Sequence, residues 1–143
     1  MLMNFDCIKD ILGYCITNID FVHDGESWTV ITVNLEQMYD ADELKKYNKK
    51  DIMYSVSKLI ECGYLRISSR FPDKTPYLDI CIIEDVTITG HEFYNSFHNK
   101  KVWNKVKSIA KQTGNITLNV LTQISSKICL EMADGMIKNH LSI

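Results

Sequence analysis

The feature that most constrains the fold is the segment at residues 49–62, whose apolar side chains follow a helical period. Those side chains form one stripe, made of Ile52, Val56, Leu59 and Ile60. Gly63 follows and is a typical C-terminal stop for a helix. Residues 64–68 then alternate between apolar and polar side chains, as a half-buried strand does. A turn at 71–76 holds both prolines of the chain, and residues 77–83 complete a β-hairpin.

Helical patterns also flank this helix–hairpin unit on both sides. Asn4 is a suitable N-cap for the first helix, and Thr87 is one for the helix after the hairpin. Thr89 with Glu92 offers an alternative capping box for that later helix. Phe93, Phe97 and Trp103 are spaced for the buried faces of the later helices. The expected flanking elements are a helix at 5–17, a turn at 23–27, a strand at 28–33, a short helix at 40–48, and helices that begin at residue 87, cover 102–110 and resume at residue 117.

The order of these elements predicts the fold class. A helix, a short strand, two helices, a hairpin and a further helix form a winged helix-turn-helix, in which three helices bury a small core and the hairpin packs on its edge. With 143 residues, 45% of them apolar, the chain suits one such core. We therefore expect a mainly α protein with a small β-hairpin, in the α+β class. A winged-helix core at residues 1–98 would carry a C-terminal helical extension at 99–143, and the two would form one cooperative domain.

Two stretches resemble known families. Residues 54–65, which read Tyr-Ser-Val-Ser-Lys-Leu-Ile-Glu-Cys-Gly-Tyr-Leu, look like the helix-then-strand segment of many winged-helix regulators. The motif Gly-His-Glu-Phe at 90–93, with Val-Trp-Asn-Lys-Val-Lys at 102–107, resembles the domain of unknown function twenty-five thirteen. That resemblance covers roughly residues 4–128 and is strongest at 85–110. That family consists of small bacterial, phage and prophage proteins, so the resemblance implies a winged-helix fold and frequent carriage on mobile elements. It implies neither an established activity nor any functional residue.

The uneven distribution of charge suggests a first function, contact with double-stranded DNA. Residues 45–74 hold eight lysines and arginines against three acidic residues. In DNA-binding winged helices the third helix enters the major groove and the wing touches phosphates. Glu61 and Asp51 would oppose such contact because carboxylates repel phosphates. The candidate nucleic-acid-binding residues are Lys49, Lys50, Tyr54, Ser57 and Lys58 on the helix, and Arg66, Arg70 and Lys74 on the hairpin.

A second function remains open beside the first, that of a protein-binding module. The total charge is only −2, and residues 1–44 carry nine acidic residues against one lysine. Strong base-reading side chains, such as paired outward arginines or glutamines, do not occur on the 49–62 helix. A host-factor inhibitor or adaptor that uses the winged helix as a scaffold is therefore the alternative interpretation.

Cysteine and histidine spacing argues against a metal site or an enzyme. The five cysteines contain no C-x-x-C pair, and each one lies in an apolar pattern typical of a small buried side chain. His91 and His98 are seven residues apart, too distant for one metal ion. His91 and Glu92 lack a third partner for acid–base catalysis. We therefore expect no catalytic residues, no metal and no cofactor.

The C-terminal segment carries a candidate homodimer seam. Its apolar stripe consists of Leu121, Ile124, Ile128 and Met132. The stripe would either pair two protomers or pack against the helix that carries Trp103.

The sequence contains no run of about 18 apolar residues, so we expect no membrane-spanning helix. Residues 1–6 lack the basic and apolar regions of a secretory signal, so we expect a cytoplasmic location in a bacterial host cell.

Overall fold

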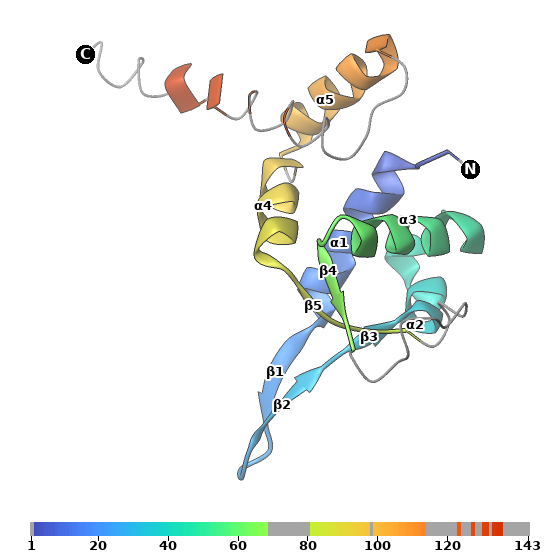
Figure 1. The fold of residues 1–143 in the computed structure, drawn as a ribbon, viewed down its shortest axis with the longest axis vertical. Helices are drawn as coiled ribbons and strands as arrows, with labels where there is room; N and C mark the ends of the chain where they lie inside the picture. Colours follow the sequence, from blue (N-terminus) through green and yellow to red (C-terminus); the bar gives the residue numbers. More distant parts are fainter. Residues whose placement is uncertain are drawn as a thin grey trace. The chain divides into compact units, whose positions relative to one another are not determined.

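A computed structural model of the chain describes residues 2–68, 81–97 and 99–113, together with isolated helical positions at 123, 127, 130, 131 and 133–135. The chain divides into two compact units, Met1–His91 and Glu92–Ile143. Figure 1 shows the ribbon with its element labels. The division between the units falls inside a helix, seven residues before the predicted boundary at residue 98. That the two parts of the chain form one cooperative domain stays a prediction.

Two long helices form the core of the first unit. Helix α1 (Phe5–Asn18) begins at Asn4, whose side chain accepts a hydrogen bond from the backbone N–H of Cys7 at 3.1 Å. Helix α3 (Lys49–Glu61) begins at Asn48 in the same way and packs against α1. Both predicted helices are confirmed. The buried side chains of α3 are Ile52, Ser55, Val56 and Leu59, whereas Ile60, predicted to point inward, is half-buried.

A three-stranded antiparallel sheet lies beside these helices. Its strands are β3 (Val33–Asn34), β4 (Leu65–Ile67) and β5 (Ile82–Val86), in the order β3-β5-β4. Leu65 lies opposite Val86, and Arg66 lies opposite Asp85. The β4–β5 pair confirms the predicted hairpin in its described part, although β5 runs to Val86 rather than ending at 83. The predicted turn at 71–76 lies outside the described residues.

The region between α1 and α3 differs most from the expectation. The predicted strand at 28–33 is two strands in different sheets, because β2 (Trp28–Ile31) pairs with an unpredicted strand, β1 (Asp20–His23), while β3 joins the main sheet. Helix α2 (Leu35–Asp40) was also not predicted. It begins at Asn34 with a reciprocal capping box to Gln37. The predicted helix at 40–48 is only a 3-10 turn, η1 (Asp42–Leu44).

Helix α4 (Ile88–Phe97) is attached to the sheet by a tight contact at its first turn. The hydroxyl of Thr87 accepts a hydrogen bond from the N–H of Gly90 at 3.1 Å and donates one to the carbonyl of Gly63 at 2.6 Å. A Cβ at Gly90 would lie 2.3 Å from the carbonyl oxygen of Tyr64, closer than real side chains approach. The predicted Thr87 cap is therefore confirmed, and the absence of a side chain at Gly90 lets α4 pack closely on the sheet.

In the second unit, three aromatic rings link the end of α4 to helix α5 (Lys100–Thr113). The rings of Phe93 and Phe97 meet edge to face with centroids 4.3 Å apart, and those of Phe97 and Trp103 at 5.0 Å. All three side chains are buried, as their spacing predicted.

These elements confirm the α+β class, a mainly helical protein with small antiparallel sheets. The order α1, β3, α2, α3, β4, β5 is the order expected of a winged helix, and that finer assignment stays a prediction. The hairpin β1–β2 is an addition to that order, and Figure 1 shows it extending away from the three-stranded sheet.

Candidate interaction surfaces

On the predicted DNA-contacting face of α3, the charge of Lys58 is paired with a carboxylate. Lys58 Nζ lies 2.8 Å from Glu61 Oε2 and 5.3 Å from the ring centroid of Tyr54. The hydroxyl of Ser57 donates to the carbonyl of Tyr54 at 2.7 Å, so this side chain is turned back onto its own helix. Tyr54, Ser57 and Lys58 are all half-buried. The hydroxyl of Ser57 and the ammonium group of Lys58 are therefore both engaged within their own helix.

The lysines around the start of α3 are mostly engaged in the same way. Lys45 pairs with Asp42 at 2.7 Å, and Lys46 pairs with Asp10 at 3.1 Å. Lys49 is exposed and lies 5.4 Å from the ring centroid of Tyr39. Lys50 is exposed, and no ion pair within the described ranges involves it. The surface is a patchwork of both signs.

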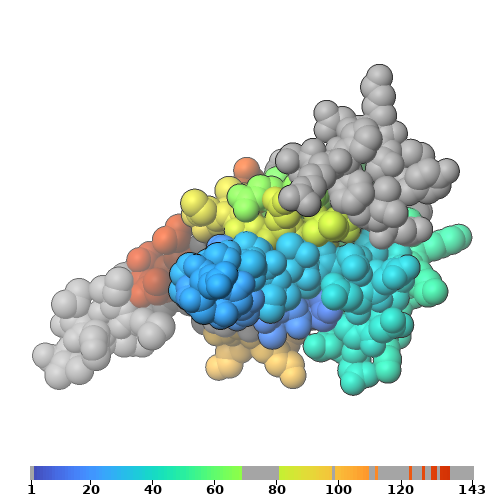
Figure 2. Space-filling view, turned by 90° about the horizontal axis from the view of Figure 1, so that it is seen from below, coloured from blue at the N-terminus to red at the C-terminus, as the bar shows by residue number. Residues whose placement is uncertain are grey.

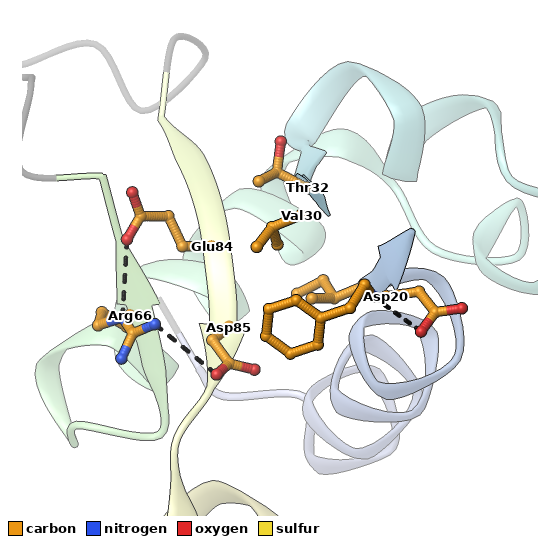
Figure 3. Close-up of a pocket in the computed structure, with 8 residues that line it drawn as sticks. Asp20, Val30, Thr32, Arg66, Glu84 and Asp85 are labelled. Carbon is orange, nitrogen blue, oxygen red and sulfur yellow. Dashed lines mark hydrogen bonds and ion pairs between the residues drawn. The ribbon is translucent and has the colours of Figure 1, made fainter. Parts of the chain in front are cut away.

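On the hairpin, Arg66 lies between two carboxylates. Its Nε is 3.6 Å from Glu84 Oε2, and its Nη2 is 3.7 Å from Asp85 Oδ2, as Figure 3 shows. The strand register causes this arrangement, because Arg66 and Asp85 are cross-strand partners. Arg70 and Lys74, the other two predicted wing contacts, lie outside the described residues.

The structure adds a surface that the sequence analysis missed, the apolar face of the β1–β2 hairpin. Phe21 pairs with Val30 across the strands, and His23 pairs with Trp28. Because side chains alternate along a strand, these four lie on one face. Phe21 is 64% exposed, Trp28 69% and Val30 45%. Figure 2 shows this hairpin at the front of the molecule, uncovered by other segments in that view. We call this face the hairpin face.

The tip of the hairpin is held by local hydrogen bonds. Asp24 Oδ1 accepts from the N–H of Glu26 at 2.8 Å and of Ser27 at 2.9 Å, and these bonds lower the pKa of Asp24. Gly25 has φ +101°, which L-residues rarely adopt. The Asp-Gly pair at this turn is a strong hairpin signal, and it could have revealed the β1–β2 hairpin where the sequence predicted only a turn.

A pocket of about 330 Å³ opens at the base of the same face. Phe21, Val30 and Ile19 form its apolar wall, and three carboxylates and one guanidinium form its polar wall. The polar residues are Asp20, Glu84, Asp85 and Arg66, and Thr32 completes the lining. The charged groups sum to −2, so the pocket favours a cation that also has an apolar part.

Burial raises the pKa of two thiols and of one tyrosine. Burial raises the pKa of Cys7 to about 11 and that of Cys15 to about 12, which keeps both thiols protonated and unreactive. The hydroxyl of Tyr47 donates to Asp10 Oδ2 at 2.6 Å, and burial together with this carboxylate raises the pKa of Tyr47 far above its usual value. Cys81 is also buried and Cys62 is half-buried, while Cys129 lies outside the described residues.

Two further expectations concern the dimer seam near the C-terminus and membrane-spanning helices. The four residues of the predicted dimer seam, Leu121, Ile124, Ile128 and Met132, lie outside the described residues, so the seam stays a prediction. Within the described ranges, no helix combines the length and the apolar character needed to cross a membrane.

Among known proteins, this chain matches the model of one family. No match to this chain was found among curated proteins or among solved structures. The model of one family matches residues 3–116, which is most of the chain and includes both the hairpin face and the pocket. The chain therefore belongs to the family described as hypothetical protein (DUF2513), the domain of unknown function twenty-five thirteen that its sequence resembles.

Proposed function

We propose that this protein is a protein-binding module, in which the hairpin face and the pocket at its base hold a segment of a partner protein that carries both apolar and cationic side chains. The observation that carries the proposal is the exposure of Phe21, Trp28 and Val30 on one face of a projecting hairpin. Isolated exposed apolar residues are ordinary on protein surfaces, but a contiguous set with two aromatic rings is typical of binding sites.

The energetics of the hairpin support this interpretation. A two-stranded hairpin is marginally stable in water on its own, and all eight residues of β1 and β2 are exposed. Folding therefore gains little from these side chains, whereas association could bury them. Each large apolar side chain that leaves water contributes about 1.5–3 kcal/mol. Trp28 and Phe21 would be the main anchors of such an interface.

The charge around the hairpin indicates the chemistry of the partner. Asp20, Asp24 and Glu26 are the charged residues of segment 19–34, which contains no lysine or arginine. Two copies of this acidic hairpin would repel each other if they met face to face. A lysine or arginine of a different protein would instead lay its aliphatic stem on Phe21 and direct its charged head toward Asp85.

The same electrostatics weigh against double-stranded DNA as the ligand of α3. A phosphate that approached Lys58 would also approach Glu61, and one that approached Arg66 would approach Glu84 and Asp85. Exposed ion pairs contribute only about 0–1 kcal/mol to stability, so their energetic effect is small, but their carboxylates would remain beside the phosphates. A winged-helix scaffold that presents a hairpin to proteins fits these contacts better. The corresponding biological role is an adaptor or host-factor inhibitor in the bacterial cytoplasm, carried by a phage or prophage.

Three matched sets of labelled peptides of about ten residues test the proposal, with Lys and Leu, Glu and Leu, or Lys and Ser as their variable positions. Fluorescence polarisation with the full chain should show binding to the Lys–Leu set and at least about tenfold weaker binding to the other two. The double variant Phe21→Thr/Trp28→Thr, which keeps good strand formers, should lose this binding. The control Leu2→Ser/Ile88→Ser, which removes two exposed apolar residues outside the hairpin, should retain it.

Two results of the peptide titrations would overturn the proposal. One is equal binding of all three peptide sets, because the hairpin face would then have no preference for the stated chemistry. The other is a Lys–Leu affinity that the Phe21→Thr/Trp28→Thr variant leaves unchanged. Sedimentation of the chain alone completes the test: concentration-dependent dimers that the same variant dissociates would show that a second copy covers the face, and would contradict a separate partner.

A further inference from the structure

We infer that the exposed face of α5 binds the phosphodiester backbone of a double-stranded nucleic acid. This surface belongs to the second unit and does not depend on the proposed function of the hairpin. The exposed residues of α5 include three lysines and two neutral hydrogen-bonding side chains on one face, namely Lys100, Lys101, Asn104, Lys105 and Ser108. Their spacing of one, three and four residues places them together along the helix.

The cations of α5 differ from those of α3 because they have no carboxylates nearby in the sequence. No aspartate or glutamate occurs between Glu92 and Glu131, a stretch that contains six lysines. A helix that is merely solvated usually mixes both signs along its surface. Lys100, Lys101 and Lys105 take part in no ion pair within the described ranges. Three lysines without an ion pair in the described ranges therefore share one face of α5, and no acidic residue lies near them in the sequence.

The opposite side of α5 holds this face in place. Val102, Trp103 and Val106 are buried, and Trp103 packs edge to face on Phe97. The helix begins after Asn99, whose Oδ1 accepts a hydrogen bond from the backbone N–H of Lys101 at 2.9 Å. The lysine face is thus carried by a packed helix, so ordering its backbone upon binding costs little.

The position of the lysines is unfavourable for the isolated helix. Lys100 and Lys101 lie in the first turn, where no acidic residue is present and where the helix dipole disfavours cations. Residues whose charge destabilises their own helix in this way are commonly explained by a function. An anionic ligand along the helix would remove the repulsion.

The burial pattern selects duplex nucleic acid among polyanions. An amphipathic helix that binds a membrane surface needs an exposed apolar side, and here that side is packed into the protein. Proteins that bind single strands stack bases on exposed aromatic rings, whereas Trp103, the aromatic residue of α5, is only 3% exposed. Lysines with asparagine and serine between them suit backbone phosphates, which are read without base specificity.

A 20-base-pair duplex DNA of mixed sequence, titrated with the full chain at several salt concentrations, tests the inference. The triple variant Lys100→Gln/Lys101→Gln/Lys105→Gln should bind at least about tenfold more weakly than the wild type. Its slope of log affinity against log salt should be smaller by about 2–3, because about three phosphate contacts are lost. Glutamine is a good helix former, and circular dichroism confirms that α5 persists.

A charge-matched control separates α5 from α3. The variant Lys49→Gln/Lys50→Gln/Lys58→Gln should bind DNA as the wild type does. The inference is overturned if this control loses binding while the α5 variant keeps it, or if the wild type shows no binding to duplex DNA at low salt. If the α5 variant also binds duplex RNA more weakly, and by the same factor as duplex DNA, this would support the same backbone contact. Binding to polyglutamate without binding to either duplex would contradict it.

Discussion

Trp28 meets His23 edge to face at the tip of the β1–β2 hairpin, with ring centroids 5.0 Å apart, and yet Trp28 remains more than two-thirds exposed. The aromatic pair therefore holds the tip together without hiding the indole from solvent. Leaving an indole ring in water costs free energy, and this ring is placed where a partner could bury it. This relationship is the basis of the protein-binding interpretation.

The hairpin face should be dispensable for folding. Because Phe21 is largely exposed, Phe21→Thr should change the free energy of unfolding in urea by less than about 0.5 kcal/mol. Ile11→Ala, which truncates a fully buried side chain of α1, should cost about 2–5 kcal/mol in the same assay. A loss from Phe21→Thr as large as that from Ile11→Ala would assign the face to the core instead.

The charge of the pocket should control its affinity for cations. Arg66→Gln removes the positive group between Glu84 and Asp85, so affinity for the Lys–Leu peptides should rise. The double variant Glu84→Gln/Asp85→Asn should lower that affinity, and raised salt should reduce both differences. Polarisation titrations of the three proteins give the comparison. Weaker binding by Arg66→Gln would show that the arginine, rather than the carboxylates, meets the partner.

The hairpin turn should loosen in acid. Hydrogen bonds from the backbone N–H groups of Ser27 and Glu26 lower the folded pKa of Asp24 below its usual value. A depressed folded pKa means that the contribution of Asp24 is fully present above the unfolded value and is lost as the pH falls through the folded value. The amide chemical shifts of Glu26 and Ser27 should therefore titrate below about pH 4. In Asp24→Asn, whose amide oxygen still accepts, this titration should disappear, and its persistence would implicate another group.

Gly90 should tolerate no larger residue. A Cβ at this position meets the carbonyl oxygen of Tyr64 at 2.3 Å and Val86 Cγ1 at 2.8 Å, so Gly90→Ala should destabilise the fold by about 1–3 kcal/mol. Gly135 is also helical, and a Cβ there would meet no atom of the described residues within 4 Å. Gly135→Ala should therefore stabilise slightly, because alanine favours helices. Thermal unfolding of both variants provides the measurement. Equal melting temperatures would show that α4 can move away from the sheet.

The parts of the fold that were predicted correctly depend on local signals. Asn4 and Thr87 are caps that act on their own helices, and the stripes of α1 and α3 have strong helical periods. The strand β1 was missed because Ile19 continues the apolar period of α1, which obscured the change to alternation at Asp20. Helix α2 is only six residues long, too short for a clear period.

The candidate site was harder to predict because it depends on pairing across the sheet. Arg66 was correctly placed on a strand after α3, but its neighbours follow from the register with β5, which is separated from it in the sequence by the hairpin turn. Lys58 illustrates the same limit within one helix, since Glu61 was recognised as a neighbour while the ion pair depends on side-chain conformation. The exposure of Trp28 depends on which elements pack on the hairpin, which no local pattern specifies.

The most direct test of the central claim uses the two tryptophans as reporters, because Trp28 is exposed and Trp103 is buried. The Lys–Leu peptides, added to saturation, should shift the emission of Trp28 to shorter wavelength and protect it from quenching by acrylamide. The variant Trp28→Phe should show neither change, since its remaining emission comes from Trp103. A Trp28 that stays fully open to acrylamide at saturating peptide would contradict the account.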